Sequence, residues 1–389
     1  MIFLKRRALM TRASFNYKTV NGIESITLEN CVETRFKRLE LLGNSAQGEN
    51  PSIESPKEIK NSGKYDEVSG KYVIDVGVTG KNLIDVDELR NENGYLQSNY
   101  MKSTKINPFY VEKDKKYLLI AKGKSISNEY STIYFGGDDL KYTYTNTYVL
   151  YSRLREYIFN ENKYVKIILT ANKTAMITSV MIHGSRLSDN EYEVEKLGLF
   201  EMSQVDSVDS IVYEPYHEPQ TVRLQLDEPL RGIGEYKDVV TKDGILRKIG
   251  HLEIKGGLTW NDYGKQFRII VSVEKAAILY SKYLCNYTND VKNFGNQHFL
   301  YLYFTKKQIE AIGINTNDTL EVANKKLNEI VVNKPIVIEY PLKTPIFEPF
   351  PQETQLALEN LHTNDGTTVI TVDSGEVETG IEVEYAIKN

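Results

Sequence analysis

The sequence predicts a mainly β protein with antiparallel sheets, and three observations support this. Short stretches of alternating apolar and polar residues recur along most of the 389 residues, separated by Gly, Asn and Asp turn signals. Tyrosine, which suits half-buried pleated surfaces, occurs 27 times. Helical periodicity is confined to the C-terminal third. We therefore expect an antiparallel, jelly-roll-like sandwich and a second β-rich body that carries two short helices.

Length and composition limit the classes of function. The chain is long enough for two or three domains. Its 48 Lys and Arg against 53 Asp and Glu give a formal charge of −5, which argues against non-specific binding of nucleic acid. Cys31 and Cys285 are too few for a disulfide framework and predict two buried free thiols. The chain contains no apolar run of membrane-spanning length and no secretory signal, so we expect no membrane insertion.

Residues 1–63 are expected to form a strand-rich attachment region that ends in a proline connector. Basic residues alternate with apolar ones across residues 35–39, which predicts a strand with one wet face. A basic patch for nucleic acid is the alternative, but the run is too short to favour it. Pro51 and Pro56 fix the backbone and extend the residues before them, so the connector should be ordered and irregular.

Residues 64–202 are expected to form the β-sandwich. Short apolar runs follow one another at regular spacing without a helical pattern between them, as in antiparallel sandwiches. Turn signals at Gly136-Gly137-Asp138-Asp139 and Ser188-Asp189-Asn190 separate several of these runs. The main predicted strands are Lys116–Ala121, Ser131–Phe135, Thr143–Tyr151, Tyr164–Thr170 and Thr178–His183.

Residues 203–350 are expected to form the second β-rich domain, and residues 351–389 a C-terminal β segment. Thr305 with Gln308 matches a capping box that begins the first helix. Asp318 with Glu321 is read as the same signal for a second helix, which Pro335 should end.

Three segments resemble tail-tip proteins of phages and prophages of Gram-positive bacteria, of the Firmicutes or clostridial type, including phage-tail-like bacteriocins. The first is Leu39–Gly63, and the others are residues 211–260 and 335–345. In addition, Lys81-Asn82-Leu83-Ile84-Asp85 resembles the start of a carbohydrate-binding jelly roll found in these proteins, although Ile84 stands where relatives often have Phe. The first segment carries the resemblance in Leu42-Gly43-Asn44-Ser45, Gln47, Pro51-Ser52, Pro56, Glu58-Ile59 and Gly63.

The resemblance implies a structural and adhesive component of a baseplate or tail fibre, which contributes to recognition of host cell-surface glycan. Its implied partners are other tail or baseplate proteins, further copies in a homotrimer, and bacterial cell-wall or surface polysaccharide. The protein would be made in the bacterial cytoplasm, built into a virion or phage-tail-like particle, and act outside the target cell. Two alternatives remain open at this point: a tail-associated polysaccharide depolymerase, and a purely structural adaptor without a ligand.

Motifs for catalysis are not found in the sequence. The five histidines show no metal-ligand spacing, and no phosphate-binding loop, dinucleotide motif or nucleophile elbow occurs. A glycosidase needs two carboxylates placed across the scissile bond, and spacing cannot select such a pair from 53 acidic residues. We therefore predict no catalytic residue, metal or cofactor, and a binding protein rather than an enzyme.

Aromatic side chains are the candidates for glycan contact. Tyr142, Tyr144 and Tyr148 share strand parity, and Trp260 and Tyr263 lie close together further along the chain. An aromatic face stacks on the apolar face of a sugar ring, and a phenol adds hydrogen bonds. Packing in the core or between subunits is the favoured alternative for the tyrosines, and a structural anchor is favoured for Trp260.

Overall fold

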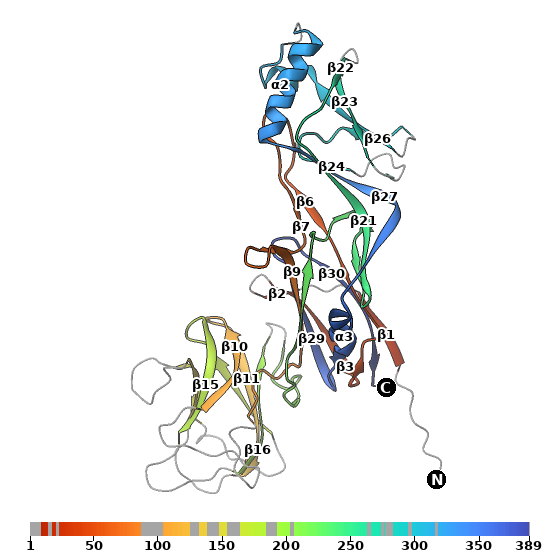
Figure 1. Cartoon of the computed structure of the whole chain (residues 1–389). Coiled ribbons are helices and arrows are strands. Elements are labelled where there is room, and N and C mark those ends of the chain that lie inside the picture. Colours follow the sequence, from red (N-terminus) through yellow and green to blue (C-terminus); the bar gives the residue numbers. More distant parts are fainter. Residues whose placement is uncertain are drawn as a thin grey trace, which may run out of the picture.

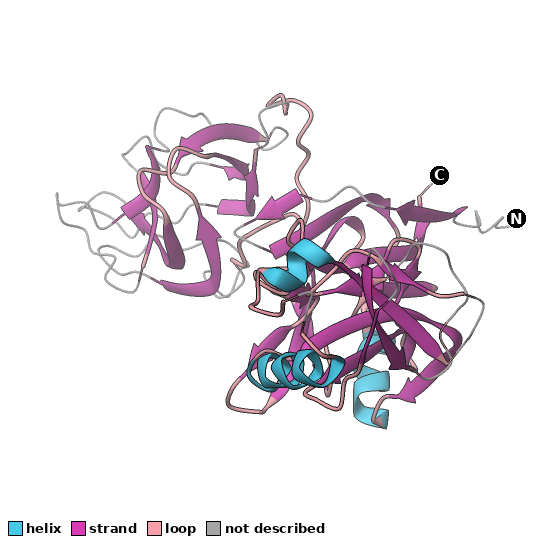
Figure 2. Ribbon diagram, turned by 90° about the horizontal axis from the view of Figure 1, so that it is seen from above, coloured by secondary structure: helices cyan, strands magenta, loops and turns pink. Residues whose placement is uncertain are grey.

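The computed structural model shows a mainly β protein with antiparallel sheets, as predicted, and with three helices among the described residues. Figure 1 shows an upper body, a central body and a sandwich that is set to one side, and Figure 2 shows the sandwich to one side again from above. The structure describes residues 9–14, 18–20, 23–86, 104–124, 132–137, 148–153, 164–183, 193–202, 206–262, 266–273, 276, 283–294, 298–315 and 318–388.

The central body is a large sheet that folds into two halves. The halves meet where Cys31 lies opposite Ile387, and side chains from both halves share one core. The order is β17 (Gln220–Leu226), β9 (Lys71–Thr79), β29 (Gly366–Asp373), β3 (Ile23–Cys31), β30 (Gly380–Ile387), β5 (Arg38–Leu42), β20 (Val239–Val240), β21 (Gly244–Ile254), β27 (Ile336–Pro349), β24 (Leu284–Cys285). Three further strands flank it: β1 (Leu9–Ser14) on β30, β2 (Lys18–Val20) on β3, and β8 (Lys64–Asp66) on β9.

Strands β9 and β17 show how the sandwich is inserted. They are antiparallel neighbours, with Val78 opposite Gln220 and Tyr72 opposite Leu226. In β9, Ile74, Val76 and Val78 are buried at a spacing of two, because alternate side chains face the core. The chain therefore leaves the central sheet after β9 and returns to the adjacent strand, so residues 80–219 are an insertion between two neighbouring strands.

The sandwich has two antiparallel sheets with an apolar core between them. Leu119, Phe135 and Leu199 are fully buried in that core. The predicted sandwich is thus confirmed, and its jelly-roll connectivity stays a prediction. One sheet has the order β10 (Thr104–Val111), β15 (Ala175–His183), β12 (Thr132–Gly136), β13 (Tyr148–Arg153), and the other β14 (Val165–Thr170), β11 (Lys116–Lys124), β16 (Glu193–Glu201).

The upper body packs one sheet against two helices, α1 (Lys306–Glu310) and α2 (Leu320–Asn333). The capping box of Thr305 and Gln308 is confirmed at α1. The prediction for Asp318 is wrong by one residue, because Thr319 caps α2 while Asp318 ion-pairs with Lys326 at 2.9 Å. The sheet has the order β22 (Trp260–Asp262), β23 (Gln266–Ser272), β26 (Phe299–Thr305), β25 (Val291–Lys292).

The predicted domain boundaries need three corrections. Strands β8 and β9 belong to the central sheet, so the sandwich begins after residue 80 and not at residue 64. Residues 203–350 are divided between the central and upper bodies, because β17, β20 and β21 join the central sheet. Residues 351–389 are no separate segment: α3 (Gln352–Asn360) packs on the central core, β28 (His362–Thr363) pairs with β4 (Thr34–Arg35), and β29 and β30 complete the sheet.

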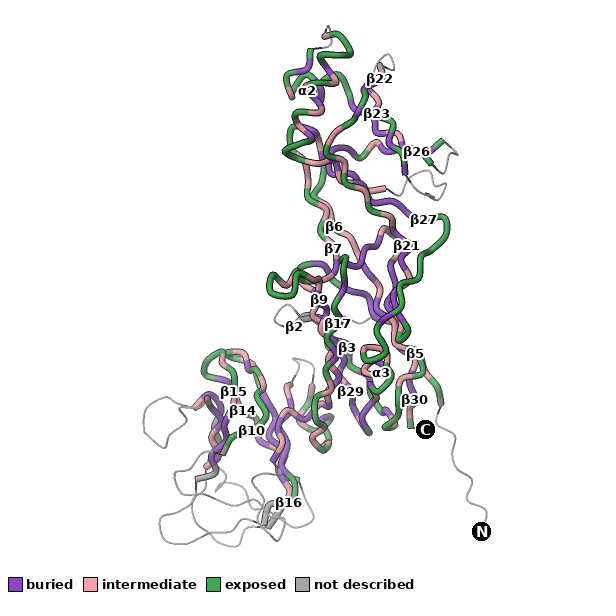
Figure 3. The backbone as a smooth tube through the Cα atoms, in the orientation of Figure 1, coloured by how far each residue is buried: buried purple, intermediate pink, exposed green. Residues whose placement is uncertain are grey.

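The proline connector ties the central body to the upper body. It contains the hairpin of β6 (Ser45–Gln47) and β7 (Ile59–Asn61). Ile53 is buried in the upper core, and Gln47 donates a hydrogen bond to the Cys285 carbonyl at 2.8 Å. Figure 3 shows buried positions in all three bodies. Both cysteines are buried free thiols, as predicted.

Candidate functional site

Tyr148 lies on the outer face of the four-stranded sandwich sheet. Of the four tyrosines that the sequence predicts for glycan contact, it is the one among the described residues. Tyr148 of β13 lies beside Tyr134 of β12, with ring centroids 5.6 Å apart and ring planes tilted by 48°. Ile133 and Phe135, the neighbours of Tyr134, are buried in the sandwich core. Because side chains alternate along a strand, Tyr134 faces away from that core.

The same face continues onto β10 and β15. Tyr110 and Met176 are register partners, and 42% and 50% of their surfaces are exposed. Val111 and Ile177, which follow them, are buried in the core. Phenol rings and a thioether on one open face suit the apolar side of a sugar ring, and the hydroxyl groups provide donors and acceptors.

The other predicted aromatic residues do not join this face. Trp260 is only 1% exposed and packs edge-on against Phe267 and Phe304, with centroids 5.9 and 5.3 Å apart. Its buried indole agrees with the structural anchor and leaves no open ring face for a sugar. Tyr142, Tyr144 and Tyr263 lie outside the described residues.

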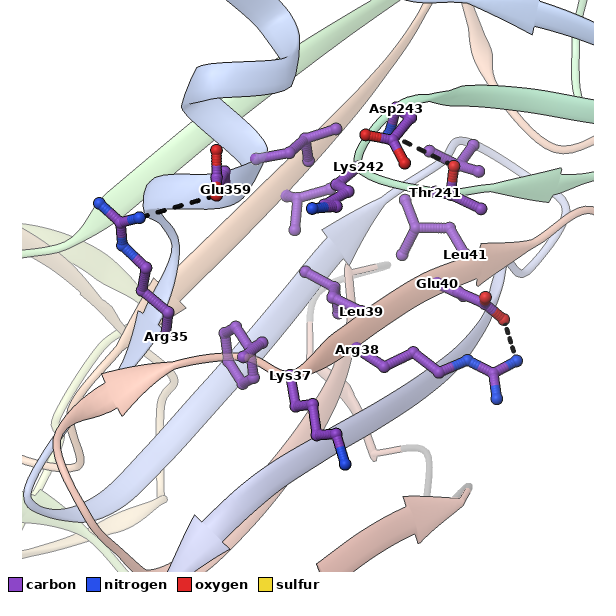
Figure 4. A pocket seen from close by; sticks show the side chains of 14 residues that line it. Arg35, Lys37, Arg38, Leu39, Glu40, Leu41, Thr241, Lys242, Asp243 and Glu359 are labelled. Carbon is purple, nitrogen blue, oxygen red and sulfur yellow. Dashed lines mark hydrogen bonds and ion pairs between the residues drawn. The ribbon is translucent and has the colours of Figure 1, made fainter. Parts of the chain in front are cut away.

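A cavity of about 350 Å³ lies in the central body between β5, the β20–β21 turn and α3. Figure 4 shows leucines of β5 between basic side chains on one side and α3 on the other. Leu41, Val76 and Val240 line the cavity and are buried in the central core. The charged residues that line it are Arg35, Lys37, Arg38, Glu40, Lys242, Asp243 and Glu359.

Three of the four basic residues at this cavity, Arg35, Lys37 and Arg38, are paired with carboxylates, and Lys242 is the fourth. Arg35 lies 3.8 Å from Glu359, and Lys37 lies 3.0 Å from Glu384. Arg38 pairs with both Glu40 and Glu382. The predicted single strand across residues 35–39 is wrong, because β4 ends at Arg35, the chain bends at Phe36 and Lys37, and β5 begins at Arg38. The three basic side chains are exposed, as expected for the solvent-facing side. Their pairing leaves no concentrated positive surface of the kind that binds nucleic acid.

A buried polar network lies at the waist, the region where β6, β7, β21 and β27 link the central and upper bodies. Its centre is Glu339, which is fully buried in β27. The Ser45 hydroxyl and the Asn61 amide each donate to Glu339 at 2.7 Å, and the Arg231 Nε lies 3.3 Å from it. Gly43 allows this approach, because a Cβ there would lie 2.7 Å from the Arg231 carbonyl oxygen.

A second buried acid, Asp238, supports the same network. It accepts backbone N–H groups from Arg231, Lys248 and Ile249 and lies 3.2 Å from an Arg247 nitrogen. Burial raises the pKa of Asp238, while Arg247 and the backbone donors oppose that shift. Together the two acids join residues 39–63, 211–260 and 335–345. Sequence reasoning missed this, because Ser45 and Glu339 are 294 positions apart and no local pattern relates them.

The described ranges contain neither a cluster of metal-binding side chains nor a membrane-spanning helix. No group of three or more His, Cys, Asp or Glu residues there is arranged to hold a metal ion. Within the same ranges, every helix is too short or too polar to span a bilayer.

Comparison with known proteins gives no match: no family model, no curated protein and no solved structure matches the chain.

Proposed function

We propose that this protein is a structural and adhesive component of a phage tail tip or phage-tail-like particle, and that it contributes to recognition of host cell-surface glycan. The observation that carries the proposal is the meeting of the three resembling segments around Glu339. Ser45 and Asn61 belong to the first segment, Arg231 to the second and Glu339 to the third. Because side chains from all three segments contact Glu339, the segments form a single framework. We assign this framework to attachment of the protein to the rest of the particle.

The inserted sandwich is the part that we assign to glycan contact. It joins the framework at two adjacent strands, so it can be exchanged without breaking the order of the central sheet. Its outer face presents Tyr110, Tyr134, Tyr148 and Met176. Weak contacts of this kind sum across copies when the wall polysaccharide repeats, because each further contact forms at high effective concentration.

Assembly contacts are assigned to the lower half of β27. There, Ile346 and Phe347 are 56% and 52% exposed on opposite faces of the strand, so each face offers one large apolar side chain for contact with a partner. Such a surface suits other tail or baseplate proteins and further copies of this chain, and we propose a homotrimer. Particle association of the purified protein tests this part, and a Phe347→Ser variant should associate less.

Co-sedimentation with Gram-positive cell walls tests the adhesive role. The Tyr110→Ala/Tyr148→Ala double variant should bind walls about tenfold more weakly, because each lost ring contact removes roughly 0.5–1.5 kcal/mol. Ile168→Ala is the control, since Ile168 is 47% exposed on the other sheet of the same sandwich. If the wild type, the double variant and Ile168→Ala bind walls equally well, this face has no role in glycan binding. Sustained release of reducing sugar from the walls would favour the depolymerase alternative instead.

A further inference from the structure

A polar groove runs across the waist, separate from the outer face of the sandwich. It has two adjoining compartments of about 540 and 520 Å³. Because the compartments share much of their lining, they form one continuous groove along β7. Compartments of this size fall within the range of small-molecule sites. The shared lining residues are Glu58, Ile59, Asn61, Tyr72 and Pro229.

One end of the groove is aromatic. Tyr65 of β8 and Tyr72 of β9 are register partners, and their ring centroids lie 5.3 Å apart in an edge-on arrangement. Tyr65 is 60% exposed. Two phenol rings beside each other at the lining of a polar groove can stack on the apolar face of a sugar and hydrogen-bond its hydroxyl groups.

The other end is lined by groups that hydrogen-bond hydroxyls. Glu58, His251 and Glu253 line it and are exposed at the surface. Each ionised carboxylate offers two acceptor oxygens, which suits neighbouring hydroxyl groups of one ring. Arg231 forms a firm part of the wall, because it is only 4% exposed and donates to Glu228 at 2.7 Å while Nε lies 3.3 Å from Glu339.

The charges favour a neutral ligand over an anionic one. Arg231 is already paired with Glu228 and Glu339. Lys60 and Lys64, which line the aromatic end, are paired with Glu376 and Asp373. An anionic sugar or a phosphate would compete with these carboxylates for Arg231, Lys60 and Lys64, and it would be repelled by the Glu58 and Glu253 carboxylates. Lys334 is the lining lysine outside these pairs, and the two carboxylates outnumber it.

We infer that the waist groove binds a neutral oligosaccharide. One sugar ring stacks on the exposed face of Tyr65, which Tyr72 supports edge-on, and Glu58 and Glu253 accept hydrogen bonds from the hydroxyl groups of the next ring. The inference rests on the proposed function in one respect, namely that the glycan comes from a bacterial surface. The groove itself is a second site, on the framework and apart from the sandwich.

Calorimetry of the full-length protein tests the inference with three linear tetrasaccharides, made of β-1,4-linked N-acetylglucosamine, α-1,4-linked glucose or β-1,4-linked galactose. We expect at least one to bind, and a glycerol phosphate oligomer, the anionic probe, to bind more weakly. Tyr65→Ala should raise the Kd about tenfold, and Glu58→Gln should raise it severalfold. Phe294→Ala is the matched control, because Phe294 is 61% exposed and packs edge-on to Tyr301 at 5.2 Å, and it should leave Kd unchanged.

Hydrogen exchange locates the bound sugar. Protection of residues 56–72 supports the groove. The inference is overturned if none of the three tetrasaccharides binds at about 10 mM, if Phe294→Ala weakens binding as much as Tyr65→Ala, or if protection is confined to β10, β12 and β15. The last result would leave the proposed function intact and move the glycan to the sandwich. Conversely, tetrasaccharide binding in the groove with no wall binding by the protein would remove the proposed function and keep the groove.

Discussion

The sandwich and the central body are both antiparallel β structures, but they are held together differently. The sandwich is formed within one stretch of the chain, around an apolar core. The central body joins distant strands, such as β1 with β30 and β3 with β29, and it buries Glu24, Asp238 and Glu339. Among the described residues, the inserted module buries uncharged polar side chains such as Asn82 beside its apolar core, whereas the framework also buries charged side chains, which specify which distant segments meet.

Removing an aromatic ring from the sandwich core should have the largest effect. Phe135→Ala should lower the free energy of unfolding of the sandwich by about 4 kcal/mol, because it deletes a fully buried side chain and leaves a cavity. Urea unfolding followed by hydrogen exchange should show the sandwich strands opening first, with the central strands still protected. If both bodies opened together, the sandwich would not be an independent module.

Removing the central acid of the waist network should have the second largest effect on stability. Glu339→Ala should cost about 3 kcal/mol of stability in the central body, because Arg231 is left buried without this partner. The control is Glu376→Ala, which breaks an exposed pair with Lys60 and should cost under about 1 kcal/mol. Urea unfolding of both variants measures the difference. Equal costs would mean that the buried network does not specify the framework.

A third test uses pH to separate the two bodies. Burial raises the pKa of Glu24 from 4.5 to about 7, and the nearby Glu378 adds to the shift. The folded state therefore holds this proton more tightly than the unfolded chain. The central body should lose up to about 3 kcal/mol of stability as pH rises from 4.5 to about 7, with no further loss from this group above that range.

Glu24→Gln should remove most of this pH dependence and stabilise the central body above pH 7. The glutamine carbonyl can still accept the Thr379 N–H that Glu24 accepts at 2.9 Å. Glu29→Gln is the control, since Glu29 is exposed on the same strand. Thermal unfolding at several pH values measures the effect, and an unchanged pH slope in Glu24→Gln would contradict it.

The smallest effect is expected in the upper body, at the capping box that the sequence predicted. Thr305→Ala should cost about 1 kcal/mol, because the Gln308 N–H loses its acceptor at the start of α1. Ser207→Ala, in a turn outside the upper body, serves as a comparison for a loop hydroxyl. Hydrogen exchange of β26 and α1 should rise in the first variant alone.

Local patterns predicted most of the elements, including five of the seven described sandwich strands, the first capping box and the end of α2 before Pro335. The predicted domain boundaries were wrong where they depend on which distant strands pair, because local patterns carry no information about that pairing. Nothing in the alternation of β9 indicates that its neighbours are β17 and β29. The predicted N-cap of α2 was wrong by one residue, because Asp318 pairs with Lys326 and Thr319 accepts the Val322 N–H instead.

The sequence by itself determined the β class, the two free thiols, the exposed basic side chains around residues 35–39 and the ordered proline connector. These follow from side-chain alternation and proline geometry, which act over a few residues. Only the tertiary structure decided that the three resembling segments surround Glu339, that Trp260 is a core residue, and that Tyr65, Tyr72 and Glu58 line one groove. Those contacts join distant positions through burial and charge pairing, and no local pattern encodes them.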